Sequence, residues 1–128
     1  MALAPVKTRV LVMEDQPEIA TVIEILLRRM GFDVAIARTG PEAIRLARHD
    51  EFDLITLDID VPEMNGFEVC RCLKDDFRFA RTPVIFVSGR SSGEDKRRGF
   101  EVGAADFIGK PFDSFTFVSR ILWHLNRR

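Results

Sequence analysis

The sequence lacks several features that mark secreted, membrane or nucleic-acid-binding proteins. It contains only two cysteines, Cys70 and Cys72, in a segment that we expect to be helical. Side chains two positions apart point to different faces of a helix, so this spacing suits neither a mutual disulfide nor a shared metal site. We therefore expect two reduced thiols, one of them in the core. A net charge of -1 gives no sign of direct nucleic-acid binding.

Long apolar runs and segments of biased composition are also missing. No apolar run approaches the ~20 residues needed to span a bilayer. The first ten residues, MALAPVKTRV, lack the basic end and apolar stretch of a secretion signal. We therefore expect a cytoplasmic protein without membrane contact. The 128 residues, 46% hydrophobic and 30% charged, contain no repeat or linker, which predicts one globular domain over residues 1–128.

Apolar runs typical of buried strands alternate with segments of helical periodicity. The expected strands are RVLVM (9–13), DVAIA (33–37), DLITL (53–57), PVIFV (83–87) and DFIG (106–109). The middle strands are continuously apolar, as expected for strands buried on both faces. Five strand and helix pairs predict an α/β fold, with one parallel sheet that has helices on both faces.

Start and stop signals delimit the expected helices. Pro17 opens the first helix and Gly31 closes it, and the fourth helix is expected within residues 91–103. Two further helices begin with the spacing of a capping box, Thr39 with Glu42 and Asn65 with Glu68, and Asp113 caps the last helix. In that last helix we expect an apolar stripe of Val118, Ile121, Leu122 and Leu125.

Polar side chains lie at the carboxyl ends of the strands, where doubly wound sheets bind their ligands. Glu14 and Asp15 follow the first strand, Asp58 the third, Ser88 the fourth and Lys110 the fifth. Each residue has an ordinary explanation as a helix cap, loop residue or solvated charge, but together they predict one site. Three carboxylates repel each other unless a cation lies among them, and their oxygens suit magnesium. The set predicts magnesium-assisted transfer of a phosphoryl group onto Asp58.

Several separated segments resemble the receiver domain of two-component response regulators. They are VLVMED, LITLDIDVPEMNG, PVIFVSG and GAADFIGKPF, in this order, and they cover nearly the whole chain. The resemblance implies the chemotaxis-type, flavodoxin-like fold, with a five-stranded parallel sheet of strand order 2-1-3-4-5. It also implies a phosphorelay switch, not an enzyme that turns over external substrates. The phosphoryl donor would be a histidine kinase or a histidine phosphotransfer protein.

The same resemblance implies a role for each acidic residue of the predicted site. Asp58 matches the phosphoacceptor. Asp15 matches the direct ligand of Mg²⁺ (or Mn²⁺), and Glu14 matches its neighbour, which acts on the metal mostly through water. Asp60 matches the position whose backbone carbonyl completes the metal site.

Further positions match the family's switch. Ser88 and Lys110 match the residues that bind the phosphoryl oxygens, and Pro111 matches a proline that often follows a cis peptide bond. Phe107 matches an aromatic residue that turns inward when the hydroxyl residue moves toward the phosphoryl group. The face formed by the fourth helix, the fifth strand and the fifth helix would then control a partner or output domain, and a dimer on phosphorylation is a further expectation.

Two departures from the family pattern affect the predicted site. Glu14 stands beside Asp15 where the family usually has two aspartates, and its longer side chain is expected to alter metal affinity. Asp60 and Arg90 occupy variable positions that tune hydrolysis of the acyl phosphate in this family. We expect these two side chains to pair across the entrance and to hinder the attacking water.

Three alternatives remain from the sequence. The segment DID at 58–60 resembles the paired aspartates of haloacid dehalogenase-like phosphatases, although Pro62 stands where that family has threonine or valine. A flavin-binding module would need a glycine-, serine- or threonine-rich loop after the first strand, where this chain has EDQPE. A permanent, unphosphorylated docking module would keep the fold but would not need the complete set of acidic, hydroxyl and lysine side chains.

Overall fold

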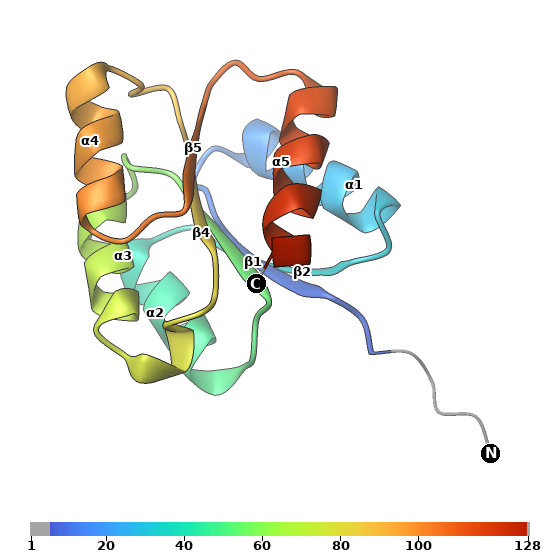
Figure 1. The fold of residues 1–128 in the computed structure, drawn as a ribbon, viewed down its shortest axis with the longest axis horizontal. Helices are drawn as coiled ribbons and strands as arrows, with labels where there is room; N and C mark the ends of the chain where they lie inside the picture. The colour runs from blue at the N-terminus through green and yellow to red at the C-terminus, as the bar shows by residue number, and fades with distance from the viewer. Residues whose placement is uncertain (1–5, 128) are drawn as a thin grey trace.

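The computed structural model describes residues 6–127. Residues 1–5 and Arg128, which belong to the predicted domain, lie outside the described residues. One parallel sheet forms the centre, with strand order β2-β1-β3-β4-β5 (Figure 1). The strands are β1 (Arg9–Met13), β2 (Asp33–Ala37), β3 (Leu54–Leu57), β4 (Val84–Ser88) and β5 (Asp106–Gly109). The predicted fold class and strand order are confirmed.

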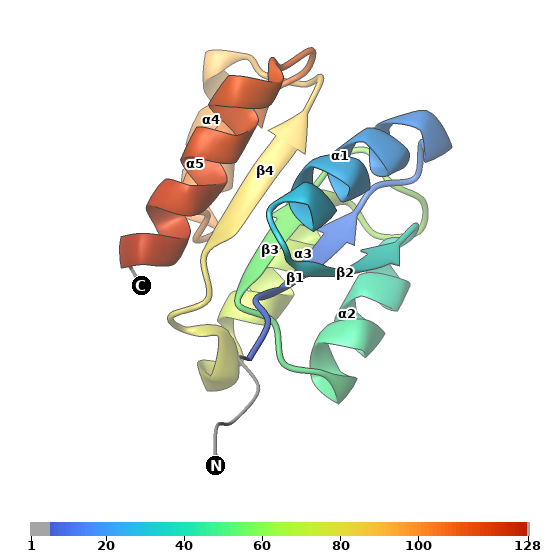
Figure 2. The same cartoon turned by 90° about the vertical axis from the view of Figure 1, so that its right-hand side faces the viewer.

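Helices cover both faces of the sheet. The bounds are α1 (Pro17–Arg29), α2 (Gly40–His49), α3 (Gly66–Lys74), α4 (Gly93–Glu101) and α5 (Ser114–Arg127), with a short 3-10 helix at Phe77–Phe79. Two apolar clusters fill the two sides, because strand side chains alternate between faces. One cluster takes its helical members from α1 and α5, and the other takes them from α2 and α3. Figure 1 shows α2, α3 and α4 on one side of the sheet and α1 and α5 on the other, and in Figure 2 α1 and α5 face the viewer.

The ends of α1 follow the predicted signals. Pro17 is the first residue of the helix, and Gly31, with a φ of 86°, follows its end in the left-handed region that glycine adopts easily. Ile23 and Leu27 of this helix are buried against the sheet, whereas Val22 is half exposed. Within residues 6–127, no helix combines the length and the apolar character that crossing a membrane requires.

The two predicted capping boxes differ in one contact. At α3, the Asn65 side chain accepts from the Glu68 N–H and the Glu68 side chain accepts from the Asn65 N–H, as predicted. At α2, the Thr39 hydroxyl accepts from the Glu42 N–H, but the Glu42 carboxylate accepts from the N–H of Arg38, one residue before the cap. The predicted box at α2 is therefore only half correct.

The predicted apolar stripe of α5 is also partly wrong. Ile121 is fully buried as expected, and Val118 and Leu125 pack at the edge of the core. Leu122 is 42% exposed, and the other fully buried side chain of the helix is Phe117. Phe117 and Ile121 are four positions apart, so the face in contact with the sheet is rotated from the expected one.

Candidate functional site

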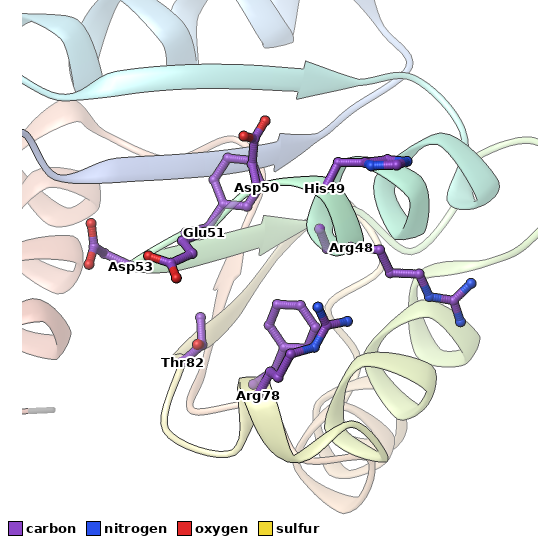
Figure 3. A pocket seen from close by; sticks show the side chains of 10 residues that line it. Arg48, His49, Asp50, Glu51, Asp53, Arg78 and Thr82 are labelled. Carbon is purple, nitrogen blue, oxygen red and sulfur yellow. The ribbon is translucent and has the colours of Figure 1, made fainter.

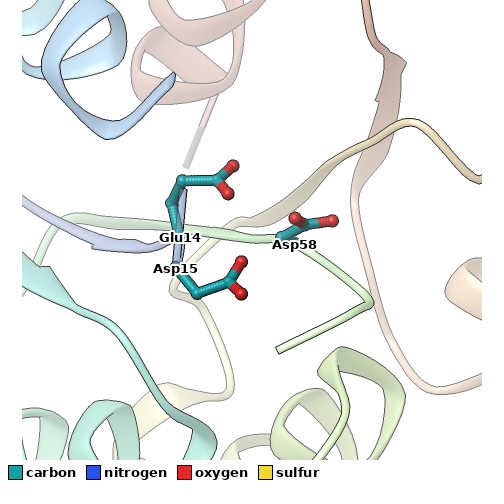
Figure 4. Close-up of side chains that lie close together, drawn as sticks. All are labelled: Glu14, Asp15 and Asp58. Atoms are coloured by element: carbon teal, nitrogen blue, oxygen red, sulfur yellow. The ribbon is translucent and has the colours of Figure 1, made fainter. Parts of the chain in front are cut away.

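Three carboxylates meet at the carboxyl edge of the sheet. Met13 of β1 lies opposite Leu57 of β3, so the residues that follow, Glu14 and Asp58, leave the two neighbouring strands at the same level. Asp15 comes next along the chain. Each of the three residues offers a ligand oxygen, and these oxygens lie within 4.8 Å of one another (Figure 4). The predicted acidic cluster is therefore formed in the fold.

Lys110 bridges two of these carboxylates. Its Nζ lies 2.6 Å from Glu14 Oε1 and 3.0 Å from Asp58 Oδ2. Burial raises the pKa of Glu14 and the nearby charge of Asp58 adds to this effect, although the hydrogen bond from Lys110 opposes it. Burial by itself would lower the pKa of Lys110, but its bonds to Glu14 and Asp58 outweigh burial and raise it. The peptide bond between Lys110 and Pro111 is cis, as the resemblance to receiver domains implied.

The backbone around Asp58 is held closely in place. The Asp58 N–H donates to the carbonyl of Met13 (3.1 Å), and the carboxylate accepts from the N–H of Ile59 (2.7 Å). At the start of α3, Gly66 donates its N–H to the Ile59 carbonyl (2.8 Å). A Cβ at Gly66 would lie 2.1 Å from the backbone oxygen of Asp58, so this close approach requires glycine. The carboxylate therefore stands on a rigid support.

The hydroxyl of Ser88 and the guanidinium of Arg90 lie on the next loop. Ser88 is the last residue of β4; its buried hydroxyl accepts from the N–H of Arg90 (3.1 Å). The Arg90 guanidinium lies 3.1 Å from an Asp60 oxygen, so the predicted pair across the entrance is formed. It also lies 3.2 Å from an oxygen of Asp95, a contact that the sequence did not predict. The spacing of Ser92 and Asp95, typical of a capping box, was the signal that could have placed Asp95 at the start of α4.

Phe107 lies inside the protein. Its side chain is 7% exposed and stacks on Phe86 of β4, with ring centroids 5.7 Å apart. Gly99 of α4 makes room for both rings, because a Cβ there would lie 3.1 Å from Phe86 and 3.2 Å from Phe107. The inward position expected for Phe107 after phosphorylation is thus the position that it already has here.

The cysteines are free, as predicted, and they have different environments. Cys70 is buried and Cys72 is partly buried. Burial raises the pKa of the Cys70 thiol to about 11. The protonated Cys70 side chain therefore belongs to the core, and neither cysteine lies in the acidic site.

A separate pocket of about 570 Å³ lies where α2 ends and β3 begins, at the opposite edge of the sheet from Asp58 (Figure 3). Charged side chains that line it form ion pairs with other residues. Asp50 pairs with Arg9 (3.5 Å), and Arg78 pairs with Asp76 (2.7 Å). Because the pocket contains none of the predicted site residues, it has no direct part in the chemistry at Asp58.

The family model for the response regulator receiver domain matches residues 10–122. The chain belongs to this family. Cell cycle response regulators CtrA of Brucella ovis and Brucella abortus are 39% identical to it over 113 residues, which are 88% of this chain and 48% of those proteins. The receiver thus spans about half the length of these curated relatives.

Solved receiver structures are similar over nearly their whole length. The Vibrio cholerae chemotaxis protein CheY4 has a TM-score of 0.87 and 29% identity, and the similarity covers 92% of this chain and 98% of that one. The receiver domain of a Pseudomonas aeruginosa sensor histidine kinase, with magnesium in its active-site cleft, has a TM-score of 0.87 and 26% identity over 94% and 99% of the two chains.

Family membership decides between the classes of function left open by the sequence. Receiver domains are signalling modules of two-component systems and not turnover enzymes, so the haloacid dehalogenase-like and flavin-binding alternatives are set aside. A histidine kinase is the kind of partner that the family implies.

Proposed function

We propose that Asp58 accepts a phosphoryl group from the phosphohistidine of a histidine kinase or a histidine phosphotransfer protein. A carboxylate oxygen of Asp58 attacks phosphorus, the bond from phosphorus to the histidine nitrogen breaks, and the imidazole leaves with the electron pair. The observation that carries this proposal is the contact of Lys110 with both Glu14 and Asp58. Lys110 can turn from these carboxylates toward the oxygens of an incoming phosphoryl group and offset their charge.

The donor set fits a divalent cation. With three ionised carboxylates and one ammonium, the cluster carries two uncompensated negative charges, and all of its donors are hard oxygens. Side chains of Glu14, Asp15 and Asp58 and the backbone carbonyl of Asp60 would hold Mg²⁺ or Mn²⁺. The ion would supply charge neutralisation for the phosphoryl oxygens.

Phosphorylation would change the loop after β4. The new group would accept a hydrogen bond from the O–H of Ser88, whose oxygen here accepts from the Arg90 N–H, so a shift of Ser88 toward the phosphoryl group would be passed to the backbone at Arg90. Movement of this loop would act on α4 and on Phe107, whose ring lies against Gly99 of that helix. The face formed by α4, β5 and α5 would then bind a partner or output domain, or a second phosphorylated copy, in the cytoplasm.

Intact mass after incubation with acetyl phosphate tests the proposal. The parent chain should gain one phosphoryl group with Mg²⁺ and much less with a chelator, and hydroxylamine should remove it, because it cleaves acyl phosphates. Asp58→Asn should gain none, whereas the matched variant Asp75→Asn, changed at an exposed carboxylate at the end of α3, should behave as the parent. A parent chain that takes up no phosphoryl group would favour the docking module instead.

A further inference from the structure

Arg90 joins two segments that flank the mouth of the site. Asp60 comes two residues after Asp58, and Arg90 comes two residues after Ser88, so their ion pair crosses from the loop after β3 to the loop after β4. The second nitrogen of the guanidinium reaches Asp95 at the start of α4 (3.2 Å). The long side chain of Arg90 is therefore held from the loop after β3 and from the start of α4, next to the loops that follow Asp58 and Ser88.

Asp95 is the more enclosed of the two carboxylates that hold Arg90. Its side chain is 13% exposed, compared with 65% for Asp60. Its other oxygen accepts from the hydroxyl of Ser92 (2.8 Å), and its N–H donates to the same hydroxyl (3.1 Å), which fixes Asp95 within the N-terminal cap of α4. Since the Asp60 side chain is mostly exposed to solvent, Asp95, which is held in the N-terminal cap of α4, is the partner that fixes the position of the Arg90 guanidinium.

We propose that Asp95 is a positioning residue that holds Arg90 across the mouth of the site and thereby sets the lifetime of the phosphoryl group on Asp58. This inference rests on the proposed function of Asp58 and adds the contribution of α4. In the step concerned, water oxygen attacks phosphorus and the bond from phosphorus to the Asp58 oxygen breaks. The carboxylate leaves with the electron pair, and the water proton passes to solvent, with inorganic phosphate as the product. A fixed Arg90 narrows the path of that water.

The first test measures the rate of phosphoryl loss from chains labelled with acetyl phosphate and then freed of the donor. Asp95→Asn keeps an oxygen that can accept from Ser92 but removes the charge that holds Arg90, so loss should be roughly two- to five-fold faster. Glu94→Gln is the control, since the neighbouring Glu94 pairs with Arg97 and not with Arg90. Equal rates for Asp95→Asn and the parent would overturn the inference.

A double variant separates action through Arg90 from a general effect on α4. If Asp95 acts by positioning Arg90, Arg90→Ala with Asp95→Asn should lose phosphate no faster than Arg90→Ala alone. Rates that multiply would show that Asp95 acts by another route and would refute the proposal.

A second measurement does not depend on phosphorylation. In the unmodified chain, the Arg90 Nη–H signals in nitrogen-correlated NMR spectra at low temperature should be protected from solvent exchange, because both Nη atoms pair with carboxylates. They should broaden in Asp95→Asn but not in Glu94→Gln. An Arg90 signal unaffected by Asp95→Asn would refute the positioning role. Failure of the parent chain to take up phosphate would refute the proposed function instead, and the NMR comparison would still decide whether Asp95 holds Arg90.

Discussion

Replacement of Lys110 by methionine tests whether the charge balance of the site stabilises the fold. The change keeps most of the aliphatic stem and removes the ammonium that lies 2.6 Å from Glu14 and 3.0 Å from Asp58. Both carboxylates then lose their cation while they remain in the same enclosed site, since their side chains are 1% and 9% exposed. Asp15, the third acid of the cluster, adds to the repulsion.

The expected loss of stability is set by the burial of this pair. Removal of one partner of a buried ion pair typically costs ~3–5 kcal/mol, because the other charge is left uncompensated. Two features favour the lower limit. The Lys110 side chain is itself 13% exposed, so water reaches the site, and Glu14 can take up a proton. We therefore expect Lys110→Met to lower the free energy of unfolding by about 3 kcal/mol at pH 7 without divalent cations.

The direction of the pH dependence follows from Glu14. Burial and the charge of Asp58 already raise the pKa of Glu14 in the parent chain, and loss of Lys110 raises it further. A carboxyl group with a raised pKa binds more protons in the folded state. Its favourable contribution is complete below its unfolded pKa and is lost as the pH rises through its folded pKa. The difference between variant and parent should therefore shrink as the pH falls toward the unfolded pKa of glutamate.

Urea unfolding followed by circular dichroism measures this effect, with and without 10 mM Mg²⁺. Mg²⁺ should recover part of the lost stability, and Glu14→Gln combined with Lys110→Met should be more stable than Lys110→Met alone. A loss below about 1 kcal/mol, the size typical of an exposed pair, would refute the argument that Lys110 compensates buried charge.

Two further predictions concern Gly66, which packs against the backbone of Asp58, and Asp106, on the face formed by α4, β5 and α5. Gly66→Ala should lower the free energy of unfolding by about 3 kcal/mol or more, because its Cβ would meet the backbone oxygen of Asp58, whereas Gly93→Ala, with open space around it, should change urea unfolding little. Burial would raise the pKa of Asp106, but hydrogen bonds from His124 and the backbone outweigh this effect and lower it. The contribution of Asp106 to stability is therefore lost as the pH falls through its folded pKa. Asp106→Asn should lower the free energy of unfolding by about 1–2 kcal/mol at pH 7, and this cost should decrease as the pH falls below the ordinary pKa of an aspartate; a cost independent of pH would contradict this.

The sequence predicted those features that local patterns encode. Asp58 could be placed at a strand end because the apolar run before it stops there, and its neighbours in the site follow from the geometry of a parallel sheet. The pair of Asp60 and Arg90 was predicted through the resemblance to receiver domains, in which these two positions are variable, and the two side chains do pair. The α3 capping box required only the spacing of Asn65 and Glu68.

The predictions that were wrong, the apolar stripe of α5 and half of the capping box at α2, depend on tertiary packing. In α5, two stripes of helical spacing overlap, one through Leu122 and one through Phe117, and the periodicity does not distinguish them. The sheet buries Phe117, and this rotation brings His124 to Asp106 of β5, with 2.9 Å between ring nitrogen and carboxylate oxygen. At α2, the reach of Glu42 to Arg38 depends on the path of the chain before the cap, which the spacing of residues does not specify.

The two cations near Asp58 are held in different ways, and this difference divides their proposed roles. Lys110 lies between two enclosed carboxylates, so its removal is costly and it stays in the site, where it can turn to the oxygens of a phosphoryl group on Asp58. Arg90 is 46% exposed and is held by carboxylates at the rim, so each of its two contacts is weak by itself and Arg90 needs both of them to remain across the mouth of the site. The strong contacts of Lys110 with Glu14 and Asp58 keep its ammonium available for the transfer of the phosphoryl group. Arg90 instead limits the approach of water, and because its contacts are weak, loss of the Asp95 charge alone is enough to change the rate of phosphoryl loss.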